Sequence, residues 1–317
     1  MWRWSLALFA FVVPNSPTAA PRSLTNAVTA GDSVIGRWDI TIRTPDGERP
    51  SWLEVERSGR DAVIGRFVGI SGSARPISRV EVHGDSLHFS IPHQWEDGDG
   101  NLSLDGHLTS GRLEGMMTFP DGKQFAWTAV RAPQLHRDHA PQWGTPIHLL
   151  HANDLGGWHS LGGTTNTWAV ANGVLRNDKP KPNIVTDRVF TDFKLHVEFR
   201  YPKGSNSGVY LRGRHEVQIQ DDYGNPPWND RFAGVYGFIE PNEMVAKRAN
   251  EWQTYDITLI GRTVTVVANG KRVICDEVIP GITGGALDSN EGAPGPIMLQ
   301  GDEGPVEYRN IVITPAR

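Results

Sequence analysis

The stretch that decides the fold of this chain is Asp192-Phe193-Lys194-Leu195-His196-Val197-Glu198-Phe199-Arg200. Apolar and polar side chains alternate along it, which places one set on each face of an extended strand. Residues 264–273 add a second signal, because Asn269-Gly270 at their centre is the dipeptide that type I′ hairpin turns favour. Residues 306–313 follow as a final strand. These patterns predict two packed antiparallel sheets in the C-terminal half.

Residues 31–131 show shorter alternating segments that are separated by turn residues, among them Pro45-Asp46-Gly47 and Pro120-Asp121-Gly122. Consecutive strands with short turns predict a small antiparallel barrel or sandwich. Proline bounds residues 132–144, which lack periodicity and are predicted to be a linker. We therefore predict an all-β chain with a smaller domain at 31–131 and a larger one at 145–317.

Composition narrows the class of partner. The chain has 317 residues, enough for two cores, and a formal charge of −5 without a basic stripe. Nucleic acid and anionic membranes are therefore poor partners. Eleven tryptophans suit either a β-sandwich core or the stacking of sugars on indole faces. The single cysteine, Cys275, excludes a disulfide within the chain and is predicted to be a small core residue.

The N-terminus has the pattern of a secretory signal. Arg3 precedes an apolar run at residues 6–13 that is too short to span a bilayer, and Thr18-Ala19-Ala20 offers a cleavage site. A buried strand is the competing interpretation. We predict that residues 1–20 are a signal peptide and that the protein is secreted or periplasmic, with no membrane anchor because no cysteine follows.

The most polar strand pair lies at residues 206–223. Polar side chains alternate with apolar ones on both strands, and the polar set is Tyr210, Arg212, Glu216, Gln218 and Gln220. A three-residue loop at 213–215 would place Arg212 opposite Glu216 and Tyr210 opposite Gln218. A solvent-facing strand would explain the same alternation. A binding surface on one face of the sheet is the other explanation of this alternation.

Several short motifs occur in order between residues 145 and 317. They are Asp154-Leu155-Gly156-Gly157-Trp158, Asn206-Ser207-Gly208-Val209-Tyr210-Leu211-Arg212-Gly213, Glu216-Val217-Gln218-Ile219-Gln220-Asp221, Asn250-Glu251-Trp252-Gln253-Thr254-Tyr255-Asp256 and Gly295-Pro296-Ile297-Met298-Leu299-Gln300. In combination they resemble the 3-keto-disaccharide hydrolase family. The resemblance implies a concanavalin-like jelly roll and a glycoside hydrolase or lyase that acts on 3-keto-sugars. Residues 31–131 lie outside it.

The chemistry that the resemblance implies starts at the C2 proton, which the C3 ketone acidifies. A base removes this proton, a donor or cation stabilises the enolate, and the C1 substituent then leaves. Either Glu216 or His159 would be the base, and Arg212 would stabilise the enolate. The expected substrate-binding residues are Gln218, Asp221, Tyr236, Lys247, Trp158 and Tyr210. Lys247 as a surface lysine and His159 as a loop residue are the alternatives.

The implied chemistry requires no cofactor, although a divalent metal on Glu216, Asp221 and a histidine would be another electrophile. The expected partner is a carbohydrate, in the form of an oxidised glycoside. Concanavalin-like folds also serve as binding modules, so a lectin-like protein without turnover is the alternative function. A structural adaptor in an exported assembly is a third.

Overall fold

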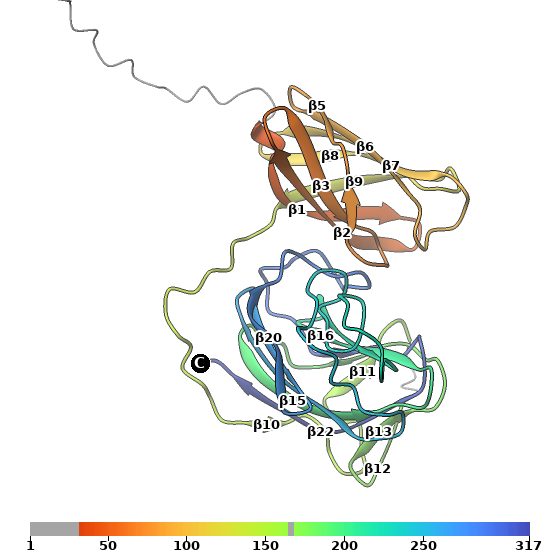
Figure 1. The fold of residues 1–317 in the computed structure, drawn as a ribbon, viewed down its shortest axis with the longest axis vertical. Helices are drawn as coiled ribbons and strands as arrows, with labels where there is room; N and C mark the ends of the chain where they lie inside the picture. Colours follow the sequence, from red (N-terminus) through yellow and green to blue (C-terminus); the bar gives the residue numbers. More distant parts are fainter. Residues whose placement is uncertain (1–31, 164–167) are drawn as a thin grey trace, which may run out of the picture.

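The computed structural model describes residues 32–163 and 168–317, which form an N-terminal sheet and a C-terminal sandwich (Figure 1). The predicted signal peptide, residues 1–20, lies outside the described residues. A short 3-10 turn, η1 (Asp32–Val34), precedes the first strand. Within the described ranges, no helix has the length and apolar character needed to cross a membrane. The all-β fold class predicted from the alternating segments is confirmed.

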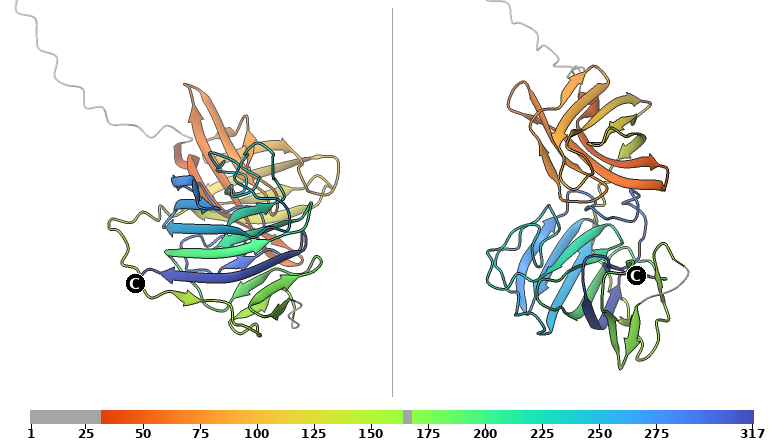
Figure 2. Two further views of the ribbon diagram at one scale, coloured as in Figure 1. Left: turned by 60° about the horizontal axis from the view of Figure 1, so that its bottom comes forward. Right: turned by 90° about the vertical axis from the view of Figure 1, so that its right-hand side faces the viewer.

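The N-terminal sheet is antiparallel, and its nine described strands follow the order β4-β3-β2-β1-β9-β8-β7-β6-β5. The strands are β1 (Gly36–Thr44), β2 (Gly47–Ser58), β3 (Ala62–Val68), β4 (Arg75–Ile77), β5 (Glu81–His83), β6 (Ser86–Pro92), β7 (Asn101–Thr109), β8 (Arg112–Thr118) and β9 (Gln124–Arg131). The sheet curls around an apolar core that includes Trp38, Phe67 and Trp127 (Figure 2). Arg75 of β4 donates to the carbonyl of Pro92 at the end of β6 (2.9 Å), which ties the two ends of the sheet together.

The C-terminal sandwich consists of two antiparallel sheets. The larger sheet has the order β12-β13-β22-β15-β18-β19-β20, with β10 beside β22, and the smaller has the order β11-β14-β21-β16-β17. The strands of the larger sheet are β10 (Ile147–His148), β12 (Ala169–Ala171), β13 (Val174–Asn177), β15 (Phe193–Arg200), β18 (Gln253–Ile260), β19 (Thr263–Ala268), β20 (Lys271–Val278) and β22 (Val306–Pro315). Those of the smaller sheet are β11 (Trp158–Ser160), β14 (Ile184–Thr186), β16 (Asn206–Leu211), β17 (His215–Gln220) and β21 (Met298–Leu299).

The core of the sandwich lies between these sheets, as the alternating stretch predicts. The apolar side chains of β15, from Phe193 to Phe199, are buried in it. Asn269 and Gly270 both have positive φ, 50° and 80°, which a type I′ turn between β19 and β20 requires. The prediction for Cys275 is wrong, because its thiol is exposed. The register of β19 and β20 shifts at this point, and the irregularity turns Cys275 away from the core.

The N-terminal sheet packs directly on the sandwich. Trp52 of β2 shares a small apolar cluster with Ile282 and Ala286, and its ring meets Phe238 edge-on at 5.3 Å. Gly281 is glycine for a steric reason, since a Cβ there would lie 2.2 Å from the Trp52 indole nitrogen. The contact is apolar and closely packed, and it brings loops of the N-terminal sheet to the edge of the smaller sheet of the sandwich.

Candidate functional site

A row of side chains crosses the outer face of the smaller sheet, one from each of its five strands. The row consists of His159, Val185, Met298, Tyr210 and Glu216, which are cross-strand partners in that order. Partners in register share a face of the sheet. The outer face therefore carries both bases that the sequence predicts.

The hairpin between β16 and β17 has a different register from the predicted one. Tyr210 lies opposite Glu216 and Leu211 opposite His215, so the loop is 212–214 and not 213–215. The shift is two residues, which preserves the alternation of faces, so the polar pattern alone could not detect it. Arg212 consequently lies in the loop, with a φ of 55°.

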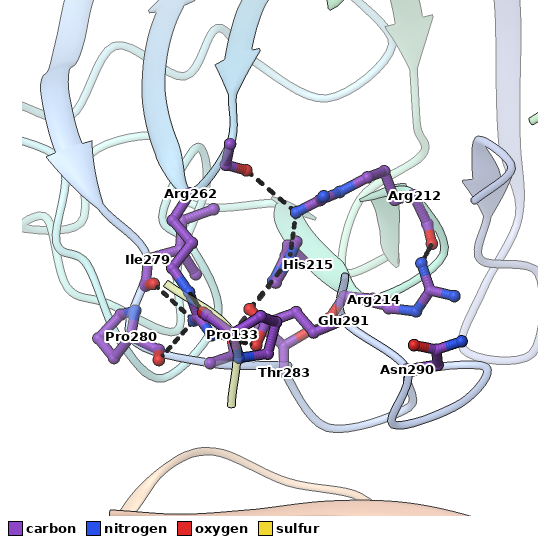
Figure 3. A network of polar contacts seen from close by, with 12 residues as sticks. Pro133, Arg212, Arg214, His215, Arg262, Ile279, Pro280, Thr283, Asn290 and Glu291 are labelled. Atoms are coloured by element: carbon purple, nitrogen blue, oxygen red, sulfur yellow. Dashed lines mark hydrogen bonds and ion pairs between the residues drawn. The ribbon is translucent and has the colours of Figure 1, made fainter. Parts of the chain in front are cut away.

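The side chain of Arg212 points away from Glu216. Its Nη2 atom donates to the carbonyl of Gly261 (3.0 Å) and lies 3.3 Å from His215 Nε2 (Figure 3). His215 precedes Glu216 on an extended strand, so the two side chains project to opposite faces. Burial lowers the pKa of Arg212 to about 10. The predicted pairing of Arg212 with Glu216 is therefore wrong, because the arginine belongs to a buried charge cluster on the other side of β17.

Glu216 forms a pair with Tyr210. The tyrosine hydroxyl donates to Glu216 Oε2 (2.9 Å), and the backbone N–H of Glu216 donates to Thr283 Oγ1 (3.0 Å). The pKa of Glu216 is raised to about 8, mainly by burial and also by the charges of Asp302 and Glu303, whereas the Tyr210 hydrogen bond acts in the opposite direction. A carboxyl group with a pKa near neutrality can accept and return a proton under physiological conditions.

Two neighbours define the position of this pair. The Tyr210 hydroxyl also lies 3.0 Å from the carbonyl of Gly284. A hydroxyl carries one hydrogen, so when Tyr210 donates to the Gly284 carbonyl, its oxygen can accept a hydrogen bond from the neutral Glu216 carboxyl. Gly208 leaves room for the carboxyl, since a Cβ at this position would lie 2.2 Å from Glu216 Oε1. The pair is thus satisfied in both protonation states.

The sequence predicts a binding surface at this face of the sheet, but the pair is buried in the structure. Glu216 is 3% exposed and Tyr210 is 2% exposed. Leu161 and Leu287 pack against the apolar cluster to which Tyr210 and Met298 belong. The segment that follows β20 covers this part of the sheet, which the alternation within two strands cannot reveal.

Tyr236 is the other predicted residue beside Glu216. Its backbone N–H donates to the Glu216 carbonyl (3.0 Å), and its side chain is half-buried. Burial raises the pKa of Tyr236 to about 12, with further contributions from the charges of Glu216, Asp230 and Glu303, while a hydrogen-bonding contact with Trp95 opposes them. Tyr236 is therefore neutral at pH 7 and able to donate a hydrogen bond.

His159 lies at the opposite edge of the sheet. Its ring nitrogen Nδ1 is 2.6 Å from Asp187 Oδ1, and its side chain is exposed. Four strand spacings separate it from Glu216, which amounts to roughly 19 Å. The two candidate bases therefore lie too far apart on the sheet to act on one carbon atom.

Gln218 and Asp221 form contacts within the fold. The Gln218 amide donates to the Asp230 carbonyl (3.3 Å), and its oxygen accepts from the N–H of Ile219 (3.0 Å). Asp221 Oδ2 accepts from the N–H of Gly204 (2.8 Å), at the far end of the hairpin. Gln218 is thus adjacent to Glu216 along the strand but already bonded, and Asp221 stabilises the loop before β16.

Trp158 and Lys247 do not lie beside Glu216, so their prediction as substrate-binding residues next to this base is wrong. Trp158 is buried in the core of the sandwich, where its indole N–H donates to the Leu149 carbonyl (2.6 Å). The strand β11 points Trp158 inward and its neighbour His159 outward. Lys247 lies next to β18 of the larger sheet, where its ammonium group donates to the Trp252 carbonyl (2.9 Å).

The sequence interpretation missed two acidic residues near the site. Asp302 and Glu303 are exposed between Gly301 and Gly304, in the connection from β21 to β22, and both raise the pKa of Glu216. The signal in the sequence was a glycine-bounded acidic turn shortly after the apolar strand β21. No group of three or more His, Cys, Asp or Glu side chains in the described part of the chain is arranged to hold a metal ion.

The two antiparallel sheets of the C-terminal half define a concanavalin-like β-sandwich. A family model described as the 3-keto-alpha-glucoside-1,2-lyase-like domain matches residues 145–314. Since this is more than half of the 317 residues, the chain belongs to that family, and the resemblance seen in the motifs is confirmed. Family membership gives the chain a carbohydrate-active role.

The chain is also similar to solved structures. A Parabacteroides distasonis protein provisionally described as a glycosyl hydrolase is 28% identical, with 58% of this chain and 96% of that chain covered and a TM-score of 0.47. A second such protein from the same organism is 25% identical, with 54% and 98% covered and a TM-score of 0.43. The carbohydrate-binding module CBM66 from Bacillus subtilis is 14% identical, with 50% and 95% covered and a TM-score of 0.36. No curated protein matches the chain.

Proposed function

We propose that this protein cleaves the glycosidic bond of 3-keto-glycosides and that Glu216 is the base. The observation that carries the proposal is the Glu216–Tyr210 pair, in which burial raises the carboxyl pKa to about 8. A base with this pKa is matched to the abstraction of a weakly acidic C–H proton near neutral pH. Membership of the 3-keto-alpha-glucoside-1,2-lyase-like family supports the substrate class.

The reaction starts with the transfer of the C2 proton to Glu216, and the electron pair of the C–H bond forms the enolate of the C3 ketone. The enolate then collapses, the C1–O bond breaks, and the aglycone leaves as an alkoxide that takes up a proton. The product is an enone, and addition of water at C1 gives the hydrolysed 3-keto-sugar. Elimination and hydrolysis thus share the step at Glu216.

Tyr236 takes the place in this mechanism that the sequence had assigned to Arg212. Its hydroxyl is neutral at pH 7 and its backbone is bonded to Glu216. A neutral donor near the carboxyl is suited to the C3 oxygen, where negative charge develops as the enolate forms. The Glu216 carboxyl has to turn toward solvent when the substrate binds, because it is 3% exposed.

The same burial favours a second candidate function, carbohydrate binding without turnover. A carboxyl that stays against Tyr210 in the complex would shape the sheet face without reaching a substrate carbon. In that case the polar face would serve only to hold the sugar, as in a lectin-like module.

The test is to incubate the purified protein with a panel of α- and β-linked 3-keto-glucosides and to follow aglycone release and enone absorbance. Glu216→Gln should reduce kcat by more than a hundredfold and retain sugar affinity in calorimetry. Glu243→Gln is the matched control, since this exposed carboxylate pairs with Lys271 on the larger sheet. Absence of release by the native protein from every substrate, with binding retained, would establish the second candidate instead.

We also propose that the chain is exported, on the basis of residues 1–20. Mass spectrometry of the mature N-terminus checks this proposal. An intact Met1 in the mature protein would contradict it.

A further inference from the structure

Two loops of the N-terminal sheet contact the segments that frame Glu216. The N–H of Gly285 donates to the Ile70 carbonyl (3.0 Å). A Cβ at Gly284 would lie 2.2 Å from the Gly72 oxygen, so the two chains pass each other without room for a side chain. Gly284 is also the residue whose carbonyl faces the Tyr210 hydroxyl. The loop at residues 69–74 is thus one residue away from the catalytic pair that we propose.

The same loop also packs against the residue that follows Tyr236. A Cβ at Gly237 would lie 2.6 Å from the Ala74 nitrogen and 2.7 Å from the Ser73 side chain. Gly237 directly follows Tyr236, the proposed donor to the substrate oxygen. The N-terminal sheet therefore fixes the backbone next to both tyrosines of the site.

A second loop, residues 93–97, presents Trp95. Its neighbours on both sides are anchored. The side-chain oxygen of Gln94 accepts a hydrogen bond from the Ser73 N–H (3.1 Å), and the Gln94 amide donates to the Ser73 hydroxyl (2.7 Å). Glu96 pairs with Arg75 at 2.6 Å, and both side chains are largely buried. The loop is held rigidly, yet the Trp95 side chain itself is 68% exposed.

Exposure of one large apolar side chain is common on protein surfaces and would not by itself indicate a site. The additional observation is its position: Gln94, the residue before Trp95, is bonded to Ser73, and Ser73 lies against Gly237, the residue after Tyr236. The Trp95 indole therefore lies where the loop of the N-terminal sheet meets the segment that carries Tyr236. Its exposed face is free to stack on the apolar face of a sugar ring.

We propose that the N-terminal sheet completes the sugar site and that Trp95 is the platform for the second ring of the substrate. This inference rests on the proposed function, in which Glu216 and Tyr236 take the oxidised ring. The ring attached through the C1 oxygen then lies outside Tyr236, where Trp95 is exposed. A sugar ring at this position is accordingly bound more tightly than a small aglycone, because only the ring can stack on the indole.

The experiment compares a 3-keto-glucosyl-glucose disaccharide with methyl 3-keto-glucoside, using the full chain. Trp95→Ala should raise KM for the disaccharide about tenfold with little change in kcat, and should change KM for the methyl glycoside less than twofold. Trp95→Phe should recover most of the loss, because a flat ring remains. Met116→Ala is the matched control, since Met116 is an exposed apolar residue elsewhere on the N-terminal sheet and should behave as the native protein.

Failure of this inference can be distinguished from failure of the proposed function. If the native protein turns over both substrates and Trp95→Ala affects neither, or both equally, the platform is refuted and the function stands. If the native protein turns over neither, the function is refuted, and calorimetric titration of both sugars then decides about Trp95. Weaker binding of the disaccharide alone to Trp95→Ala would support the platform, whereas equal affinities or no binding would refute it.

Discussion

Replacement of Glu291 by glutamine should destabilise the protein strongly, because this carboxylate is the centre of a buried charge cluster between the two units (Figure 3). Glu291 is ion-paired with Arg262, and the two side chains are 0% and 2% exposed. His215 Nε2 lies 3.6 Å from the other carboxylate oxygen. Glutamine keeps the shape and removes the charge, which leaves the guanidinium groups of Arg262 and Arg212 buried without their carboxylate.

The expected cost is about 3–5 kcal/mol, the range for breaking a buried ion pair by removing one partner. One group can offset part of it. Burial and the charge of Glu291 raise the pKa of Asp39, on β1 of the N-terminal sheet, to about 8, so Asp39 is mostly neutral at pH 7. Once Glu291 is replaced, Asp39 should ionise and compensate the arginines.

A double-mutant cycle tests this account. Asp39→Asn alone should cost about 1 kcal/mol, since it replaces a mostly neutral group. The double variant with Glu291→Gln should cost about 1–3 kcal/mol more than the sum of the single changes, because no carboxylate remains to ionise.

Urea denaturation followed by tryptophan fluorescence measures these differences as shifts of the midpoint at constant slope. Lys271→Ala, which removes an exposed ion pair with Glu243 at 3.0 Å, is the matched control and should stay within about 0.5 kcal/mol of the native protein. A cost below about 1 kcal/mol for Glu291→Gln would refute the reasoning.

Four further predictions concern single positions. Gly208→Ala should lower kcat/KM about a hundredfold, because its Cβ would fall 2.2 Å from Glu216 Oε1 and displace the carboxyl; unchanged kinetics would contradict this geometry. With Glu216 as base, kcat/KM should rise with pH and level off above about pH 8. Tyr210→Phe should move this profile to higher pH, because it removes the hydrogen bond that lowers the pKa of Glu216. A rate that falls over the same pH range would identify Glu216 as an acid. The pKa of Glu216 is higher in the folded chain than its ordinary value of 4.5, so its contribution to the free energy of unfolding should be lost as pH rises through about 8, which denaturation at several pH values measures. Cys275 should react with a thiol reagent in the folded protein within minutes, and labelling only after denaturation would show that the thiol is buried.

Local patterns were sufficient for the elements and for the class of fold. The alternation at β15 and the Asn269-Gly270 turn predicted strands and a hairpin that the structure contains, because side-chain period and turn conformation are properties of neighbouring residues. The outward direction of Glu216 and Tyr210 was likewise contained in the alternation of β16 and β17. The family motifs added the carbohydrate-active role, which no periodicity carries.

The arrangement of the site was decided by tertiary structure. A two-residue shift of the hairpin leaves the alternation unchanged but moves Arg212 from the side of Glu216 into a buried cluster with Arg262 and Glu291. Sequence spacing also carries no information about strand order, and the strand order separates His159 from Glu216 by the width of a sheet.

The packing of Ser73 and Ala74 against Gly237 joins residues far apart in the sequence, on units whose packing no local pattern encodes. The sequence by itself thus determined which residues form strands and which faces are polar, since these depend on near neighbours. Only the packed structure decided which polar groups meet, because register, strand order and the docking of the two units are set by the burial of distant surfaces against each other.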